Sequence, residues 1–560
     1  MNTILGELGK SPKFCEYIKK IENQKSPIVI SGLTDVGMAQ MISATKEFVK
    51  RPICVITYNE IQARKIVDDL SYFTDKVIYL PKKEIVTYDY IAESKDLPYE
   101  RIEVLTKIKE KRSPIIITTI EALLQKLPPK EVLFKNILHF KVGDTTSLDD
   151  IKKKLVNLGY VRCDLIEGRG QFSIRGGILD ISISEKIGVR IEFWGDEIDS
   201  IRNFAIASQR SINTLEKVNV YPAHEYILEG TIKDVCNKIK NLDEMQNKKE
   251  IIEEDIEQII AGNYISKIDK YFDFFYSKTN TLLDYITENY IIVLDEERKI
   301  HQRTINIEKD KENLINNLIE KNKIVPQILE NFEKYENIEN EIEKGKKNLI
   351  YVEKQNSITN KQAEKYIFEY REINYYKSEI ENFFKELKEA IKKQKSIYIL
   401  VENKEKAKKL KETLEKENII TKIEEKLDKT IIAKTKEKIV TIGIGKLSAG
   451  FENYEINQLV ISADELISGE KRKRKQVHSA YNEGEKVVFA DLKIGDFVVH
   501  RTYGIGIYIG VNTIKADGTI KDYIKIKYKN DDILYVPTNQ MDAIRKYVGG
   551  DKINPKINKL

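Results

Sequence analysis

Residues 28–39 read IVISGLTDVGMA, an apolar run that passes through a turn into a helical pattern. Gly32 and Gly37 have the G-x-x-x-x-G spacing of a phosphate-binding loop between a strand and a helix. A working loop continues with Lys and then Ser or Thr, because the ammonium neutralises phosphate oxygens and the hydroxyl ligates Mg²⁺. Met38 and Ala39 occupy those positions. We therefore predict a unit that keeps the fold of a nucleotide-binding site but neither binds nor hydrolyses ATP.

The same alternation of strand and helix continues to about residue 127. Apolar runs occupy residues 28–31, 53–57, 77–80 and 115–119. Helical patterns begin near Met38, Glu60 and Glu100. This order is typical of a parallel sheet with crossover helices, so we predict an α/β domain over residues 1–127.

Residues 128–222 change to a β pattern. Between residues 145 and 222, polar residues alternate with β-branched or aromatic ones, and glycines such as Gly176 and Gly177 mark turns. We predict an antiparallel β domain. In an alternating strand, Arg169 and Arg175 point to one face and Phe172 to the other, so the two arginines are expected to share a surface above an apolar layer.

Helical patterns rich in Lys and Glu follow, and then a second, smaller α/β pattern. One apolar strand, residues 290–297, interrupts the helices and ends in Asp295-Glu296, as a magnesium-binding pair would. Magnesium-binding carboxylates have no function where no side chain holds the phosphates. We therefore interpret the pair as a second remnant of a nucleotide-binding site. The strands predicted for the small α/β domain are residues 396–401, 438–443 and 457–462. Its glycine spacing, Gly445 to Gly450, continues with Phe451 and Glu452 and cannot serve a phosphate.

The C-terminal pattern is all-β. The basic run Lys471–Lys475 is interpreted as an exposed hinge, with a nucleic-acid contact as the alternative. Short strands from about residue 488, closed by a short helix at 539–547, predict a small SH3-like barrel. The turn His500-Arg501-Thr502-Tyr503 beside Ile505 is the predicted contact surface. Ile505, Ile507 and Val511 are themselves expected to alternate into the barrel core.

Composition narrows the function classes. The 94 basic and 89 acidic side chains of this 560-residue chain leave a net charge of +5. This small overall charge does not indicate a protein that coats nucleic acid. The four cysteines and five histidines are scattered, which signals neither a zinc site nor a disulfide framework. The sequence has no signal peptide and no run of about 18 apolar residues. We expect a cytoplasmic protein without a metal or a membrane partner.

Three stretches of the chain resemble known families. RGQFSIRGGILDI (169–181) with RIEFWGDEIDSIRNF (190–204) and QRS (209–211) is similar to the second domain of the repair protein UvrB. LPKKEIVTYDY (80–90) followed by LPYERIEVLTKI (97–108) is similar to transcription-repair coupling factors. GDFVVHRTYGIGIYIGV (495–511) with LYVPTNQMDAIRKYVGG (534–550) resembles the RNA-polymerase-interacting domain that they share with CarD-type regulators. In this order, the blocks are identified as the N-terminal half of the transcription-repair coupling factor (Mfd) family.

The resemblance implies a multidomain α/β protein that recruits partners in transcription-coupled excision repair. The implied segments are a degenerate helicase-like α/β domain (1–127), a UvrA-binding β domain (128–222), the completion of the UvrB-like module (223–350), a small α/β domain (351–468), a basic linker (469–487), a CarD-like domain (488–550) and the start of a further linker (551–560). Arg169, Phe172 and Arg175 would bind UvrA. His500, Arg501, Thr502, Tyr503 and Ile505 would bind the polymerase β subunit.

The same resemblance places ATP, magnesium and most double-stranded DNA contact in a translocase beyond Leu560, with no cofactor in this chain. One departure concerns the hairpin with which UvrB wedges DNA: only about 18 residues separate Leu80 from Pro98, so that hairpin is not expected here. The alternatives are a CarD-like transcription regulator and a UvrB-like DNA helicase.

Overall fold

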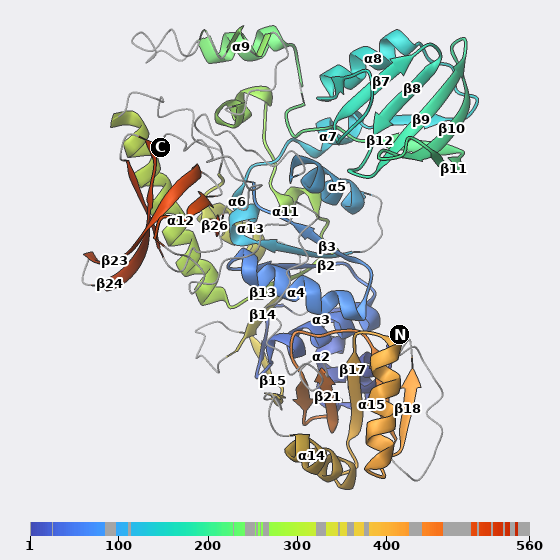
Figure 1. The fold of residues 1–560 in the computed structure, drawn as a ribbon, viewed down its shortest axis with the longest axis vertical. Coiled ribbons are helices and arrows are strands. Elements are labelled where there is room, and N and C mark those ends of the chain that lie inside the picture. Colours follow the sequence, from blue (N-terminus) through green and yellow to red (C-terminus); the bar gives the residue numbers. More distant parts are fainter. Residues whose placement is uncertain are drawn as a thin grey trace. The chain divides into compact units, whose positions relative to one another are not determined.

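The structure is a computed structural model of the whole chain (Figure 1). It describes residues 2–24, 26–83, 97–109, 114–227, 229–240, 253, 256–257, 259–260, 268–320, 332–344, 348–354, 363–373, 380–424, 439–462, 494–500, 503–516, 519–529, 532–537 and 544–546. The described residues up to 462 form one compact unit and those from 494 a second. None of the described helices combines the length and apolar character that crossing a bilayer requires.

A seven-stranded parallel sheet organises the first unit. Its strands, in spatial order, are β15 (Glu364–Ile367), β1 (Ile28–Ser31), β14 (Asn348–Glu353), β13 (Ile291–Asp295), β2 (Ile53–Thr57), β4 (Ile115–Thr119) and β3 (Val77–Leu80). The four strands predicted for residues 1–127 are confirmed. Three strands from beyond residue 290 complete the sheet, and two of them flank β1. The predicted start of the small α/β domain at residue 351 therefore falls inside β14 of this sheet.

The crossover helices begin where side-chain caps are available. The helix after β1, α3 (Asp35–Val49), begins three residues before the predicted Met38, because the Thr34 hydroxyl accepts a hydrogen bond from the Gly37 amide. Helix α4 (Glu60–Phe73) begins as predicted, with Asn59 as its cap. Helix α5 (Leu97–Lys109) contains the predicted Glu100. Side-chain caps thus account for the starts of α3 and α4.

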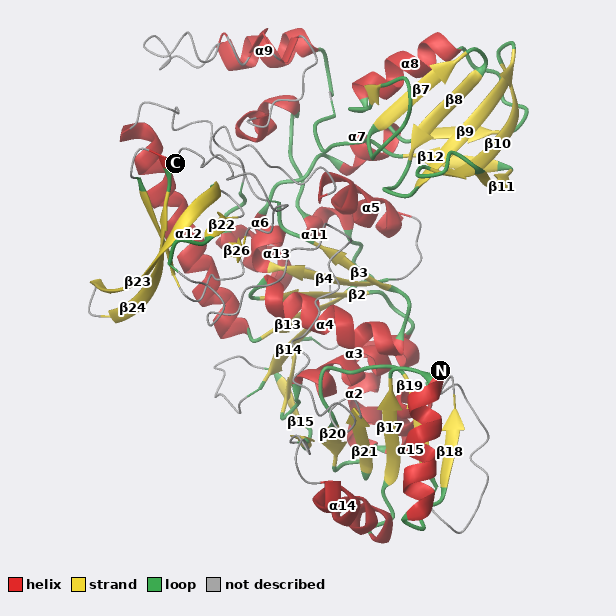
Figure 2. Ribbon diagram, viewed as in Figure 1, coloured by secondary structure: helices red, strands yellow, loops and turns green. Residues whose placement is uncertain are grey.

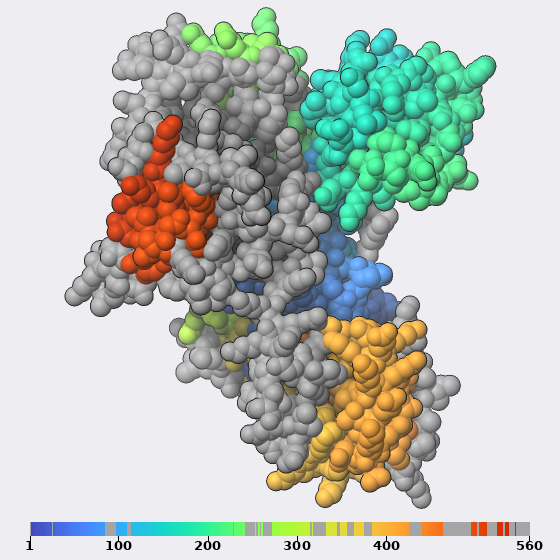
Figure 3. All heavy atoms as spheres, in the orientation of Figure 1, coloured from blue at the N-terminus to red at the C-terminus, as the bar shows by residue number. Residues whose placement is uncertain are grey.

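The predicted antiparallel sheet of the β domain is confirmed, except that its last two strands, β7 (Gln171–Arg175) and β6 (Val161–Arg162), pair in parallel. The six-stranded sheet runs in the order β11 (Ser211–Leu215), β10 (Glu197–Ala205), β9 (Ile187–Trp194), β8 (Ile178–Ser182), β7 and β6. Helix α8 (Leu148–Asn157) and the pair β5 (Leu138–Lys141) and β12 (Lys217–Val220) pack against one face, around Phe172, Leu179 and Ile191. Figure 1 shows α8 beside β7 and β8, and Figure 3 shows the domain as one turquoise-to-green body. The other face, hereafter the open face, has a much smaller apolar cluster among the described residues, made of Ile166, Phe204 and Ile206.

A second α/β sheet follows in the same unit. Its order is β16 (Tyr370–Glu372), β20 (Phe451–Asn453), β21 (Gln458–Ser462), β17 (Ser396–Val401), β19 (Val440–Ile444) and β18 (Thr421–Glu424). The three predicted strands correspond to β17, β19 and β21. Helices α14 (Ile380–Lys392) and α15 (Lys404–Lys416) form a core with one face of this sheet (Figure 2).

The second unit is an antiparallel sheet in the order β25 (Ile533–Pro537), β24 (Thr519–Lys527), β23 (Gly504–Ala516), β22 (Phe497–His500) and β26 (Ile544–Lys546). The predicted helix at 539–547 is wrong over residues 544–546, which form β26 and pair with β22. The alternation predicted for β23 is also wrong: Tyr508 points into the core with Val498, Ile524 and Ile526, whereas Val511 is exposed and Ile505 and Ile507 are half-buried. The described pairings give an antiparallel sheet and do not close it into a barrel.

Candidate interaction sites and a closed glycine loop

Another segment of the chain packs against the loop Gly32–Gly37, hereafter the glycine loop. Gly32 has a φ of +78°, and a Cβ there would overlap the Phe368 carbonyl oxygen. A Cβ at Gly37 would lie 2.6 Å from the Tyr370 ring. The Tyr370 amide donates to the Gly32 carbonyl at 3.1 Å, and its hydroxyl donates to Gln40 Oε1 at 2.8 Å. The segment between β15 and β16 therefore occupies the space in front of the loop.

The groups that replace the missing lysine and hydroxyl are apolar and buried. Met38, which is 2% exposed, and Ala39 belong to the core beneath the parallel sheet. Asp35, in the first turn of α3, pairs with Lys65 of α4 and with Lys354, just after β14. Burial raises the pKa of Asp35, but the hydrogen bonds and charges of these lysines outweigh it and lower the pKa to about 2. An internal carboxylate thus occupies the helix N-terminus where a phosphate would bind.

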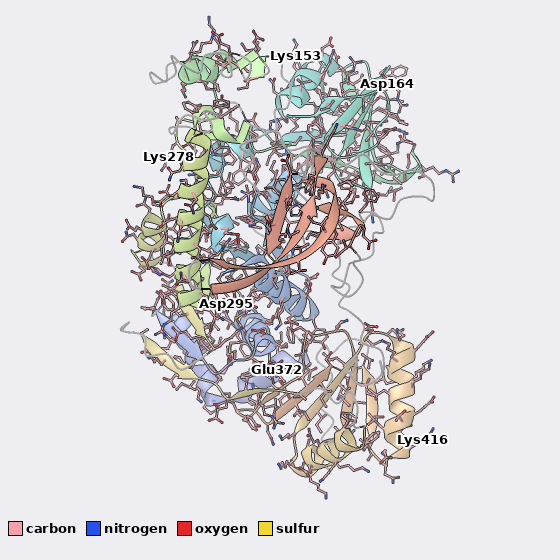
Figure 4. The ribbon with its side chains drawn as sticks, turned by 60° about the vertical axis from the view of Figure 1, so that its left-hand side comes forward. Lys153, Asp164, Lys278, Asp295, Glu372 and Lys416 are labelled. Atoms are coloured by element: carbon pink, nitrogen blue, oxygen red, sulfur yellow. The ribbon has the colours of Figure 1, made fainter. Side chains whose placement is uncertain are left out.

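Asp295 lies at the end of β13, two strands from the glycine loop (Figure 4). Its carboxylate is fully buried and accepts a hydrogen bond of 2.8 Å from the Thr57 hydroxyl. Desolvation raises its pKa to about 6, against the opposing effects of Thr57 and Lys354. Among the described residues, no group of three or more His, Cys, Asp and Glu side chains could hold a metal ion.

The open face of the β domain carries a cluster of two arginines and one aspartate. Asp180 of β8 is 2% exposed and accepts two hydrogen bonds from Arg190 of β9, at 2.7 Å from Nε and 2.8 Å from Nη2. Arg175 of β7 donates to Asp180 Oδ2 at 2.9 Å and is half exposed. One carboxylate therefore holds two guanidinium groups, which leaves this part of the face with a net positive charge.

Trp194 adds an aromatic group to the same face. It is the only tryptophan of the chain and is 84% exposed. In β9, Val189, Ile191 and Phe193 pack toward the core, so Arg190, Glu192 and Trp194 alternate to the open face. Arg202 of β10 pairs with Glu192 there. Arg190 and Trp194 were not predicted from the sequence, although the β9 alternation and the single tryptophan before the Gly195-Asp196 turn were signals that could have revealed them.

The predicted UvrA-binding residues occupy different environments. Phe172 is 0% exposed in the core, where its side chain supports the sheet from below and is not accessible to a partner, and UvrA binding by these residues stays a prediction. The alternation is confirmed within β7, where Arg175 points away from Phe172 and Ile174. Arg169 precedes β7, and its guanidinium lies over the Tyr99 ring of α5 at 5.9 Å. Its neighbour is therefore α5, whereas the neighbours of Arg175 are Asp180 and Arg190.

The turn predicted to bind polymerase is partly internal. His500 is buried, which lowers its pKa, and its Nδ1 accepts a hydrogen bond of 3.3 Å from the Tyr503 amide. Tyr503 packs against the core of the sheet, and Ile505 is half-buried. Arg501 and Thr502 lie outside the described residues. Access to this turn is therefore limited at His500 and Tyr503.

Strand β25 has more exposed apolar side chains. It is last in the described order of its sheet, and Ile533 and Tyr535 are 41% and 40% exposed. Leu534 and Val536 alternate with them and contact the core. Lys525 of β24 lies 5.6 Å from the Tyr535 ring. Strand β25 is therefore a candidate edge strand with apolar side chains on its outer face.

Two parts of the chain match protein-family models. Residues 138–226 match the UvrB interaction domain, and these residues contain the open face with Asp180, Arg190 and Trp194. Residues 492–548 match the CarD-like/TRCF RID domain, and these residues contain the five strands that the structure describes in the second unit.

Similarity to curated proteins extends over the whole chain. It is 30% identical over 588 residues to the transcription-repair-coupling factor of Bacillus subtilis (strain 168). It is 30% identical over 577 residues to the protein of the same name from Staphylococcus aureus (strain USA300). Each match covers 100% of this chain and 48% of the relative. The chain thus spans about half the length of the curated relatives it matches.

Proposed function

We propose that this chain is the recruiting part of a transcription-repair coupling factor, which binds a stalled RNA polymerase and brings the excision-repair protein UvrA to it. Matches to two family models and similarity along the whole chain to proteins of that name support this proposal. The observation that carries it is the pair of candidate contact surfaces, each inside one matched domain.

The open face of the β domain is the proposed UvrA site. A buried carboxylate fixes Arg190 by two hydrogen bonds, so its orientation is set before a partner arrives. Arg175 and Trp194 add a half-exposed guanidinium and an exposed indole. Tryptophan and arginine are the residue types most often responsible for binding energy at interfaces. We therefore assign the main contacts to Arg175, Arg190 and Trp194, with Arg169 as a peripheral residue.

The proposed site is tested by measuring UvrA affinity for the full chain and single variants. Trp194→Ala is expected to weaken binding about thirtyfold or more, because truncation of an interface anchor costs about 2 kcal/mol. The matched control is Ile212→Ala, which removes an exposed apolar side chain from the edge strand of the same sheet. Arg169→Ala should have a smaller effect than Trp194→Ala. Wild-type chain that does not bind UvrA would overturn the function; equal binding by wild type and Trp194→Ala would overturn the site.

The second unit is the proposed polymerase site, through the β subunit and an added strand at β25. We propose an SH3-like barrel for the complete domain and a cytoplasmic location, which the four free cysteines favour. A CarD-like regulator would use this domain alone, and the match over residues 138–226 argues against that alternative.

ATP, magnesium and most DNA contact belong, in this proposal, to the part of the relatives' length that this chain does not match. The filled glycine loop argues against a UvrB-like helicase, because Tyr370 packs against the loop and Asp35 places an ion-paired carboxylate in the first turn of α3.

A further inference from the structure

The first unit contains two glycine loops, and each receives a tyrosine from the opposite α/β sheet. The glycine loop after β1 receives Tyr370, the first residue of β16 in the second sheet. The second glycine loop, Gly445–Gly450, follows β19 of the second sheet. A Cβ at Gly445 would overlap the ring of Tyr72, which belongs to α4 of the first sheet. The two insertions are therefore reciprocal.

A buried carboxylate reinforces the second insertion. Asp69 of α4 is 1% exposed and accepts two hydrogen bonds of 2.7 Å from Ser448, one from the amide and one from the hydroxyl. Ser448 lies inside the second glycine loop. Helix α4 thus contributes one aromatic ring and one carboxylate, one helical turn apart, to a loop that is distant in sequence.

Helix α3 lies between the two sheets. Val36 belongs to the apolar cluster with Tyr398, Leu400 and Val460 of the second sheet, whereas Met38 and Met41 belong to the core of the first. Gln40 lies between these sets, and its amide donates to Gln458 of β21 at 2.7 Å while its oxygen accepts from Tyr370. Residues 36–46 of this helix are all buried.

We propose that the two glycine loops act as reciprocal sockets that lock the two α/β sheets into one cooperative body, with Tyr370 and Tyr72 as the inserted groups. Gly32 and Gly37 are needed because the crossing segment approaches the loop backbone too closely for a side chain. The chain's own segment thus takes the place of a bound phosphate as the group that stabilises the loop.

Gly37→Ala tests the lock because helix propensity and the contact with Tyr370 predict opposite changes in stability. In an ordinary helix, alanine is more favourable than glycine. Here the new methyl group would meet the Tyr370 ring, so the variant should unfold at a lower denaturant concentration than wild type, and amides of β17 and β21 should exchange faster. In the Tyr370→Ala background the ring is gone and only the Thr34 hydroxyl oxygen, 3.0 Å from the new Cβ, remains close, so adding Gly37→Ala should lower the unfolding midpoint much less than it does in the wild-type chain.

Tyr72→Ala tests the second socket in the full chain, with Tyr454→Ala as the matched control. Tyr454 lies in the turn between β20 and β21, is 47% exposed, and its ring contacts Lys395. Tyr72→Ala should accelerate hydrogen exchange in β19 and β21 about tenfold or more, because truncating a packed aromatic ring removes its buried contacts. The lock is overturned if Gly37→Ala is as destabilising in the Tyr370→Ala background as in the wild-type chain, or if Tyr72→Ala behaves like Tyr454→Ala. If Tyr72→Ala does not fold, the Gly37 and Tyr370 pair still decides.

Discussion

Asp69 is a buried carboxylate whose ionisation opposes folding. Desolvation raises its pKa to about 6 from an ordinary value near 3.8, although the two hydrogen bonds from Ser448 lower it. The native state therefore keeps a proton that the unfolded state releases, so this group's contribution to stability falls as pH rises from about 4 through 6. Two pKa units correspond to about 3 kcal/mol.

Asp69→Asn is expected to remove that pH dependence. The asparagine oxygen can accept from the Ser448 amide and its nitrogen can donate to the hydroxyl, so the geometry is preserved. Urea unfolding at intervals from pH 4 to 8 should show the variant gaining on wild type up to about pH 6.5 and keeping a constant advantage above it. Asp35→Asn is the control and should change stability in the opposite direction. The pKa of Asp35 is about 2, which means that its ionisation stabilises the fold. An advantage of Asp69→Asn that is largest at pH 4 would contradict the assignment.

Some single-residue features can be predicted from the sequence and others cannot. The sequence shows directly that Met38 and Ala39 supply no lysine or hydroxyl, and its alternation places Arg175 opposite Phe172. What fills the glycine loop is not readable, because Tyr370 lies 330 residues beyond its partner Gln40. Arg190 and Trp194 were also missed, since the pattern alone does not say which face of a sheet stays open.

Elements differ in how well local pattern determines them. Strands β1, β2, β3 and β4 follow from apolar runs between helical repeats, because a buried parallel strand is apolar on both faces. Strand β26 was expected to be helical, and three residues are too few for a reliable period. Its pairing with β22 is a tertiary contact that overrides local preference.

Strand β25 gives the prediction at this scale. Ile533→Glu places a charge on the exposed side of the edge strand, where a partner strand from polymerase would bury it, so affinity for the β subunit should fall about tenfold or more. Co-elution and titration with the isolated subunit measure this. Val511→Glu is the control, because Val511 is similarly exposed but lies on β23, which is separated from β25 by β24. If both variants bind as wild type does, the contact lies elsewhere. A charge at Tyr503 is a poorer test because its ring packs against the core.

At the scale of the whole molecule, the parallel sheet is assembled from two distant parts of the chain. Residues 28–119 supply four strands, and residues 291–367 supply three that insert beside and between them. The β domain is an insertion between these parts, and the buried pair Arg101 and Glu225, 2.6 Å apart, ties its exit to α5. The two halves of the sheet could not be joined from pattern alone, because parallel pairing is not encoded by neighbouring residues.

Because the chain's own segment packs against the glycine loop, we expect that the chain binds no ATP. We also expect that restoring the missing loop side chains does not restore ATP binding. Titration calorimetry of the full chain with Mg-ATP should give no binding heat, and a micromolar Kd would contradict this. Met38→Lys/Ala39→Thr restores the missing side chains of the loop but should still bind no ATP, because Tyr370 packs against the loop and the Asp35 carboxylate would repel a phosphate at the start of α3. It should also lose on the order of 3 kcal/mol of stability, since position 38 lies in an apolar core where an ammonium is costly. Ile61→Lys, at an exposed position of α4, adds the same charge and should change stability by less than about 0.5 kcal/mol. A double variant that bound ATP at undiminished stability would mean that the loop is open and that neither the crossing segment nor the carboxylate closes it.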